Sequence, residues 1–484
     1  MKLLSKEQWF SKLENLSTPF RKYGSFLPEQ RKLLEEVYNK LTNSQKPILV
    51  FVAPTASGKT HTICLIARTL QGKNYRIAIL VPNNYLKEEY EKAQHDVRGQ
   101  LQDIDFLNIF EYLKTTKQYN FVLADEAHNL KTFLELDRNI VRSIDFTEKE
   151  DLFFDIANRH LPPNKSFIAK QLSFNSAREL LDDLDNIPKF SKHLRPIIQN
   201  PTSWTSFIYI WRQNKRCSIK FVRSSDYLCK LKLPMDHMLM FSASPLSDKE
   251  LQFYCGIPAS SIERATPIKT TADWRKKQSV YFSVIDEFSS KDKTSLLEEL
   301  IRETKTRTLI LFNNFDSCKK TFKSLDKIFD NITMIPPAPL TINLQKFNDF
   351  LSYRNGTLLT ASTVFWEGIT IEGLKLVIIT DPPYPRPTLV DLVKKKRIFG
   401  KQDITRRLQQ GLGRIARRQG EYGIGILLFD IDKHCKEVQN IVGKNRVLRT
   451  KSPQCLLVLH KIFTDKSPPL DMFISSKCSE SSHI

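Results

Sequence analysis

Short runs of apolar residues recur along the chain and alternate with longer amphipathic stretches. Such runs are typical of parallel strands buried on both faces, and the amphipathic stretches are typical of the helices that cover them. The runs fall into two sets about 180 residues apart, so we expect an α/β chain with two parallel-sheet lobes in tandem. The predicted strands are residues 48–52, 76–81, 121–124, 308–312, 374–380 and 423–429.

The chain changes character between residues 130 and 234. Residues 144–185 are rich in charged, helix-forming side chains and are interrupted by Pro162 and Pro163. We therefore expect a mainly helical insertion within the first lobe. The predicted segments are a first lobe (1–129), the insertion (130–234), completion of the first lobe with a linker (235–275), a second lobe (276–465) and a flexible Ser/Pro-rich tail (466–484).

The net charge favours a polyanionic partner. Lys and Arg number 74 against 53 Asp and Glu, for a formal net charge of +21. This excess favours a nucleic acid or nucleotide, although a Lys-rich composition alone has the same effect on the isoelectric point. No apolar run is long enough to span a bilayer and the first residues are charged, so we expect no membrane partner and a cytoplasmic location, or a nuclear one in a eukaryote.

A phosphate-binding loop follows the first predicted strand. The run APTASGKT at residues 53–60 lies between this strand and an apolar helix. A helix N-terminus offers backbone N–H groups to phosphates, Lys59 supplies a cation, and the Thr60 hydroxyl suits Mg²⁺. The sequence therefore predicts a nucleotide site formed here by Ala53, Thr55, Ser57, Gly58, Lys59 and Thr60.

An acidic pair ends the third predicted strand. Asp125 and Glu126 begin the run DEAH directly after residues 121–124. At the carboxyl end of a strand beside the phosphate loop, Asp125 is placed to hold Mg²⁺ together with Thr60, and Glu126 to polarise the attacking water. We therefore expect ATP and Mg²⁺ as cofactors of an ATP hydrolase.

The second lobe contributes a candidate for charge stabilisation. Arg414 and Arg417 lie three residues apart, with Gln410 one helical turn earlier, so the three can face one anion. Arginines in this role stabilise the charge that develops during γ-phosphate transfer. The alternative is a basic helix that faces solvent, because Arg406 and Arg407 lie nearby. In the first interpretation, ATP closes the gap between the lobes and hydrolysis reopens it.

Taken in order, these motifs resemble those of the XPD/DinG group of superfamily 2 DNA helicases. The strongest match is the run FWEGITIEGL followed by a strand and a Pro-rich turn. The matching segments are residues 26–30, 53–60, 81–86, 125–130, 240–247, 311–315, 365–374, 381–387 and 410–417.

The resemblance implies two RecA-like lobes and a 5′-to-3′ motor on single-stranded or partial-duplex DNA. It implies that Gln30 reads the adenine and that Glu367 and Gly368 belong to the nucleotide site. The insertion lies where the family carries its arch domain. Protein partners are a further expectation, in particular those of a repair or defence complex.

Three departures from the family pattern matter. Members with an iron–sulfur cluster place four cysteines before the DEAH run, and residues 90–124 contain none, so we expect no iron–sulfur cluster. Without the cluster domain, strong duplex unwinding is in doubt. In addition, Thr370 replaces the family's Asp and Ser244 its Thr, which we expect to weaken coupling more than hydrolysis. Third, we expect no exonuclease domain of the kind that some DinG-type proteins carry, because the sequence before Gln30 is too short for one.

These departures leave alternatives open. One is a nucleic-acid-stimulated ATPase subunit without strong unwinding of its own. Others are an RNA helicase and a P-loop kinase, against which the Trp-Glu-Gly run and the second-lobe arginines speak, respectively. Candidate contacts to nucleic acid are the basic and aromatic residues at 211–223 and the run Lys394–Arg397. Both segments can equally be strands or helices whose basic side chains face water.

We expect the substitution Lys59→Ala to abolish ATP hydrolysis, because the β- and γ-phosphates lose their cation. Binding of single-stranded DNA should be largely retained. Phosphate release and strand binding measure the two effects, and turnover equal to that of the unchanged protein would remove the phosphate-loop assignment.

Overall fold

The structure is a computed structural model of the 484-residue chain. It describes residues 4–16, 26–53, 57–71, 75–95, 104–132, 141–147, 167–173, 197–200, 204–211, 216–223, 235–268, 279–284, 289–337, 343–366, 369, 371–384, 400–415, 423–430 and 447–450, and several isolated positions.

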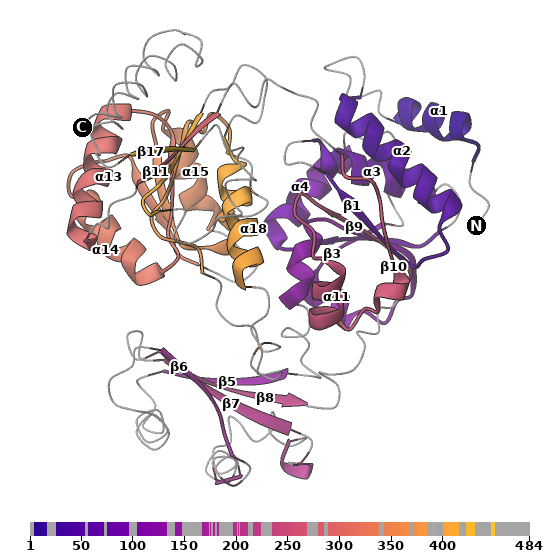
Figure 1. The fold of residues 1–484 in the computed structure, drawn as a ribbon, viewed down its shortest axis with the longest axis horizontal. Helices are drawn as coiled ribbons and strands as arrows, with labels where there is room; N and C mark the ends of the chain where they lie inside the picture. Colours follow the sequence, from indigo (N-terminus) through magenta and orange to yellow (C-terminus); the bar gives the residue numbers. More distant parts are fainter. Residues whose placement is uncertain are drawn as a thin grey trace.

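The described part of the first lobe is built on a parallel sheet of six strands in the order β10-β1-β9-β4-β2-β3 (Figure 1). Strand β9 comes more than a hundred residues after β4, yet it pairs with β4 on one side and with β1 on the other. The strands are β1 (Ile48–Val52), β2 (Ile77–Val81), β3 (Ile104–Asn108), β4 (Tyr119–Ala124), β9 (Met235–Ser242) and β10 (Ile262–Arg264).

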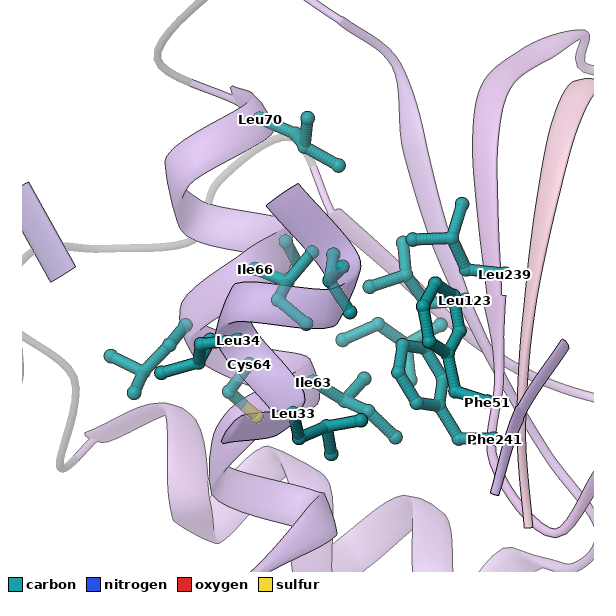
Figure 2. Packing of buried hydrophobic residues seen from close by; sticks show 14 of the residues in the cluster. Leu33, Leu34, Phe51, Ile63, Cys64, Ile66, Leu70, Leu123, Leu239 and Phe241 are labelled. Atoms are coloured by element: carbon teal, nitrogen blue, oxygen red, sulfur yellow. The ribbon is translucent and has the colours of Figure 1, made fainter. Parts of the chain in front are cut away.

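Helices cover both faces of this sheet, because alternate strand residues point to opposite sides. In β1, Leu49 and Phe51 enter one apolar cluster while Ile48 and Val50 enter another. The Phe51 and Phe241 rings stack with centroids 5.1 Å apart in the first cluster (Figure 2). The helices are α1 (Lys6–Leu16), α2 (Pro28–Asn43), α3 (Lys59–Gln71), α4 (Asn84–His95), α5 (Ile109–Lys114) and α11 (Asp248–Cys255), with short 3₁₀ helices η2 (Ala127–Thr132) and η4 (Ala259–Ser261).

The second lobe has a parallel sheet of seven strands within the described ranges, in the order β13-β14-β12-β15-β16-β11-β17. A Cβ on Gly425 of β16 would lie 2.7 Å from side-chain atoms of both Leu412 and Tyr281, so only glycine lets this strand and its covering helix approach so closely. The strands are β11 (Ser279–Val284), β12 (Thr308–Leu311), β13 (Ile332–Ile335), β14 (Thr357–Thr360), β15 (Leu376–Ile379), β16 (Gly423–Leu427) and β17 (Val447–Thr450). The helices are α13 (Ser290–Thr304), α14 (Phe315–Leu325), α15 (Leu344–Ser352), α16 (Thr363–Trp366) and α18 (Gly400–Leu412).

The two lobes and all six predicted strands are confirmed, with ends that shift by at most two residues. The segment boundaries proposed from the sequence stay predictions. Within the described residues, no helix combines the length and the apolar character needed to cross a membrane.

The described part of the insertion contains strands that we did not expect. Four described strands form an antiparallel sheet in the order β5-β8-β7-β6, which Figure 1 shows apart from the two lobe sheets. In β8 the buried Ile219 and Phe221 flank a half-buried Lys220. The described strands are rich in β-branched and aromatic residues, which favour strands. The strands are β5 (Val141–Thr147), β6 (Phe167–Gln171), β7 (Trp204–Trp211) and β8 (Arg216–Arg223).

We expect Phe241→Ala to lower the free energy of unfolding by about 3–5 kcal/mol, because it removes a buried ring and leaves a cavity beside Phe51. Urea denaturation followed by circular dichroism measures the loss. The matched control is Ile328→Ala at an exposed position of the second lobe, expected to change stability by about 0.5 kcal/mol or less. Equal losses in both variants would contradict this account of the core.

Candidate nucleotide site

Three sequence motifs meet at one edge of the first sheet. Strands β1, β9 and β4 are neighbours and run in the same direction, so their carboxyl ends lie side by side. The phosphate loop follows β1, and Asp125 follows β4. Ser242 is the last residue of β9, and Ser244 lies just beyond it. The parallel arrangement therefore brings together motifs that lie far apart in the sequence, at the edge where open α/β sheets bind ligands.

Gln30 braces the phosphate loop. Gly58 has a φ of +74°, and a Cβ at this position would lie 2.2 Å from Nε2 of Gln30. The Gln30 amide donates to the Gly58 carbonyl at 3.4 Å, and its Oε1 accepts from the Leu27 N–H at 3.0 Å. The backbone conformation and the adjacent side chain therefore both require glycine at position 58. The adenine-reading role of Gln30 stays a prediction.

Lys59 and the acidic pair share a buried space. Lys59 Nζ lies 3.6 Å from Glu126 Oε1, and the Glu126 N–H donates to Asp125 Oδ1 at 2.9 Å. Glu126 has a φ of +45°, which is rare for a residue with a side chain and marks a backbone held by its surroundings. Four predicted site residues (Gly58, Lys59, Asp125 and Glu126) thus lie together in the structure.

Two buried polar atoms at this edge fit a bound nucleotide. Among the described residues, neither Ser57 Oγ nor Glu126 Oε2 has a hydrogen-bond partner. Buried polar atoms are normally paired, so unpaired ones beside a lysine and two carboxylates are suited to a phosphate group and a water molecule. Oxygen donors from Asp125 and Thr60 are of the kind that Mg²⁺ prefers.

Burial controls the protonation of Asp125. Loss of water, and to a smaller extent the neighbouring Glu126 carboxylate, raise the pKa of this carboxyl group to about 6. Lys59 and the hydrogen bond from Tyr90 act in the opposite direction. A metal ion binds the ionised carboxylate, so protons and Mg²⁺ compete for this group.

Tyr90 is a site residue that the sequence analysis missed. It lies fully buried in α4, and its hydroxyl donates to Asp125 Oδ2 at 2.8 Å. The same hydroxyl has a hydrogen bond with Thr60, and burial raises the Tyr90 pKa well above its usual value. A neutral tyrosine therefore links both predicted Mg²⁺ ligands. Only its position on the buried face of an amphipathic helix distinguished it in the sequence.

His128 connects the two lobes. The Gln410 amide nitrogen, on α18 of the second lobe, lies 2.9 Å from His128 Nε2. Because this nitrogen can only donate, His128 Nε2 accepts and its Nδ1 donates to Ser242 Oγ at 3.0 Å. His128 Nδ1 also lies 3.5 Å from Glu126 Oε2. A continuous polar path thus leads from Gln410 to the predicted water-polarising residue.

The arginine pair is only partly described. Helix α18 lies on the side of the second lobe that faces the first (Figure 1). Arg414 is buried and donates to the Ile369 carbonyl within its own lobe. Burial raises the pKa of Tyr85 in the first lobe to about 12, and the charge of Arg414 acts against this rise, so Arg414 lies close to the first lobe. Burial excludes the solvent-facing alternative for Arg414. Four other predicted site residues lie outside the described residues: Thr55, Glu367, Gly368 and Arg417.

The candidate nucleic-acid contacts gain no direct support. The residues at 204–211 and 216–223 form strands, as the alternative had it, but in the separate antiparallel sheet rather than in the first lobe. The run Lys394–Arg397 lies outside the described residues. Among the residues that are described, no group of three or more His, Cys, Asp or Glu side chains could hold a metal ion, and Cys64, Cys255 and Cys318 are buried. The expectation of a cluster-free chain stays a prediction.

Comparisons with known proteins agree with a two-lobed ATPase. Residues 24–108 match the family described as type III restriction enzyme, res subunit, and residues 297–442 match the helicase C-terminal domain. The first match spans β1 to β3 and the second spans β12 to β16, so each lobe has its own match.

Solved structures show the same fold. An XPD helicase superposes with a TM-score of 0.55 at 15% identity, covering 88% of this chain and all of that one. Dbp5 of S. cerevisiae, bound to RNA and ADP BeF3, superposes with a TM-score of 0.54 at 13% identity, covering 95% and 96%. A probable replication factor C subunit 5 of Dictyostelium discoideum is 30% identical over 98 residues, which are 20% of this chain and 26% of that relative.

We expect Tyr90→Phe to weaken Mg²⁺ binding about 5- to 10-fold, because Asp125 loses a hydrogen bond that orients it. Titrations with Mg²⁺ measure the effect on ATP hydrolysis and, separately, on the binding of a fluorescent ATP analogue. Tyr112→Phe is the matched control, since Tyr112 is another buried tyrosine of the same lobe that lies in a different apolar cluster. An unchanged Mg²⁺ dependence in Tyr90→Phe would exclude Tyr90 from the site.

Proposed function

We propose that this chain, an ATP-hydrolysing helicase of the XPD/DinG type in superfamily 2, moves 5′ to 3′ along single-stranded or partial-duplex DNA. The contact between Gln410 and His128 carries the proposal, because it joins the second lobe to the acidic pair of the first. Polarity and the preference for DNA come from the resemblance of the motifs to that group. The similarity to an RNA-bound helicase makes RNA the substrate to test against.

In the proposed reaction, the first lobe binds the nucleotide and prepares the water. Ser57, Gly58 and Lys59 hold the phosphates, while Asp125 and Thr60 hold Mg²⁺. The metal ion supplies neutralisation of the charge that develops on the phosphate oxygens. Glu126 accepts a hydrogen bond from the attacking water and orients it in line with the bond that breaks.

The second lobe makes hydrolysis depend on the position of α18. Gln410 holds His128 through Nε2, and His128 in turn lies beside Glu126 and Ser242. Arg414 and Arg417 would stabilise the charge that develops on the phosphates during transfer. Each lobe contributes one side of the nucleotide site. Every cycle of closing and opening can therefore shift a nucleic-acid strand that is bound across both lobes.

A second candidate is an ATPase subunit that is stimulated by nucleic acid but does not unwind a duplex. Two observations favour it: residues 90–124 lack the cysteines of the cluster domain, and Ser244 stands where the family has Thr. Ser244 contacts the site through its backbone, whose N–H donates to Ser242 Oγ at 3.1 Å. The methyl group that the family's Thr adds is absent from this coupling segment.

We expect single-stranded DNA to raise the ATPase rate at least 10-fold and RNA to raise it less. Phosphate release with DNA, with RNA and without nucleic acid measures this, and Lys59→Ala gives the background rate. Greater stimulation by RNA would overturn the DNA assignment.

Partial duplexes separate the two candidates. A translocating helicase of the proposed polarity displaces the strand from a substrate with a 5′ single-stranded overhang, and not from one with a 3′ overhang. DNA-stimulated hydrolysis without displacement on either substrate would select the ATPase-subunit alternative. Displacement only on the 3′ overhang would reverse the proposed polarity.

A further inference from the structure

Helix α18 presents a buried polar face to the first lobe. Asp403, Arg406 and Gln410 are spaced by three and four residues, so they lie on one side of the helix. All three are buried, although burying charged groups is unfavourable unless each one is paired. Each of them has a partner in the first lobe, which makes this face the junction between the lobes.

Arg406 makes the most contacts of the three. Its Nη2 donates to both carboxylate oxygens of Glu250 in α11, at 2.9 and 3.1 Å. Its Nη1 donates to Asp403 at 2.7 Å, and its Nε donates to the Ser244 carbonyl at 3.0 Å. A planar guanidinium group with three directed contacts fixes both position and orientation, which a lysine cannot do.

Glu250 is held equally firmly on the side of the first lobe. Its Oε2 accepts from the Ser247 N–H at 2.7 Å and from the Ser247 hydroxyl at 2.9 Å, closing the capping box at the start of α11. The Arg406 side chain therefore contacts both ends of the segment 244–250, which follows the Ser242 hydroxyl that binds His128.

A second ion pair crosses the junction beside the first. Lys131 of η2 donates to Asp403 at 2.7 Å, three residues after His128. The two positive and two negative groups balance, so the buried network carries no net charge. Ion pairs therefore lie beside the Gln410–His128 contact on two segments of the first lobe, one in η2 and one in residues 244–250.

We propose that Arg406 is a positioning residue for ATP hydrolysis: its pairing with Glu250 fixes the register of α18 against the first lobe so that Gln410 meets His128. One helical turn is about 5.4 Å, so a slide of even part of a turn would separate the Gln410 amide from the imidazole. The inference rests on the proposed nucleotide site, because it assigns that site a device that couples it to the second lobe.

The ion-pair network stabilises the junction between the lobes rather than the fold of either lobe. Glu250 and Ser244 belong to the first lobe, and Arg406 belongs to the second, so removing one partner leaves each hydrophobic core unchanged. A charge that loses its buried partner favours separation of the lobes, which returns it to water. Substitution of Arg406 is therefore expected to change the alignment of the lobes and to leave nucleotide binding by the first lobe nearly intact.

The test compares Arg406→Met with Arg264→Met. Arg264 also pairs with a carboxylate of α11, Asp248, and also donates to a carbonyl of the preceding loop, that of Leu246, but all three lie in the first lobe. We expect Arg406→Met to lower kcat about 10- to 100-fold, the effect of a misaligned site, with less than a 3-fold change in the affinity for a non-hydrolysable ATP analogue. Arg264→Met should change kcat less than 3-fold.

Amide hydrogen exchange gives a readout that is independent of hydrolysis. In Arg406→Met, we expect faster exchange in peptides covering residues 126–132 and 403–412, with no change in β1 and β12. Lys59→Ala should lose hydrolysis while retaining the exchange of the unchanged protein in these peptides. Hydrolysis retained in Lys59→Ala would thus contradict the proposed nucleotide site. Unchanged exchange in Arg406→Met would contradict the proposed role of Arg406.

Two further variants keep the test decisive. Glu250→Gln retains an acceptor for Ser247 but removes the charge, so it should reproduce the loss in kcat even where Arg406→Met folds poorly. Arg406→Lys should recover only part of the rate, because an ammonium group cannot reach Glu250, Asp403 and Ser244 together. The proposal is overturned when Arg406→Met and Glu250→Gln keep kcat and exchange within 3-fold of those of Arg264→Met.

Discussion

The junction between α18 and the first lobe depends on buried polar groups that have partners only when the lobes are aligned. An apolar interface tolerates small slides, since dispersion contacts have little directionality. The contacts of Arg406, Asp403 and Gln410 are directional, and each loses its partner within a shift of about 1 Å. This junction therefore has one well-defined closed arrangement, as a machine that couples hydrolysis to movement requires.

The site on the first lobe shows how one side chain is held by the next. Lys59 lies beside Glu126, Glu126 lies beside His128, and His128 binds Gln410 of the other lobe. Tyr90 holds Asp125 from the opposite side. A few contacts thus link Lys59 to the second lobe, all of them in a buried region where electrostatic effects are strong.

The sequence singled out the charged residues of the candidate site but not the residues that hold them in place. Lys59, Asp125 and Glu126 were identifiable because a loop after a strand and an acidic pair at a strand end have local signatures. Tyr90 and Arg406 carry no such signature. One is a tyrosine on an amphipathic helix and the other is one of several arginines in a basic run. The strands of the insertion were missed for a related reason, because their antiparallel pairing joins segments that lie far apart in the sequence.

The sequence by itself determined the two α/β lobes, the strands on which the motifs sit and the residue types at the phosphate loop, because each follows from a pattern within a few neighbouring residues. Only the tertiary structure decided that β9 lies between β1 and β4, and that Arg406 meets Glu250, 156 positions away in the sequence. Strand order and the pairing of buried charges arise from contacts between distant segments. Such contacts are selected by how the whole chain buries its apolar surface while pairing its polar groups.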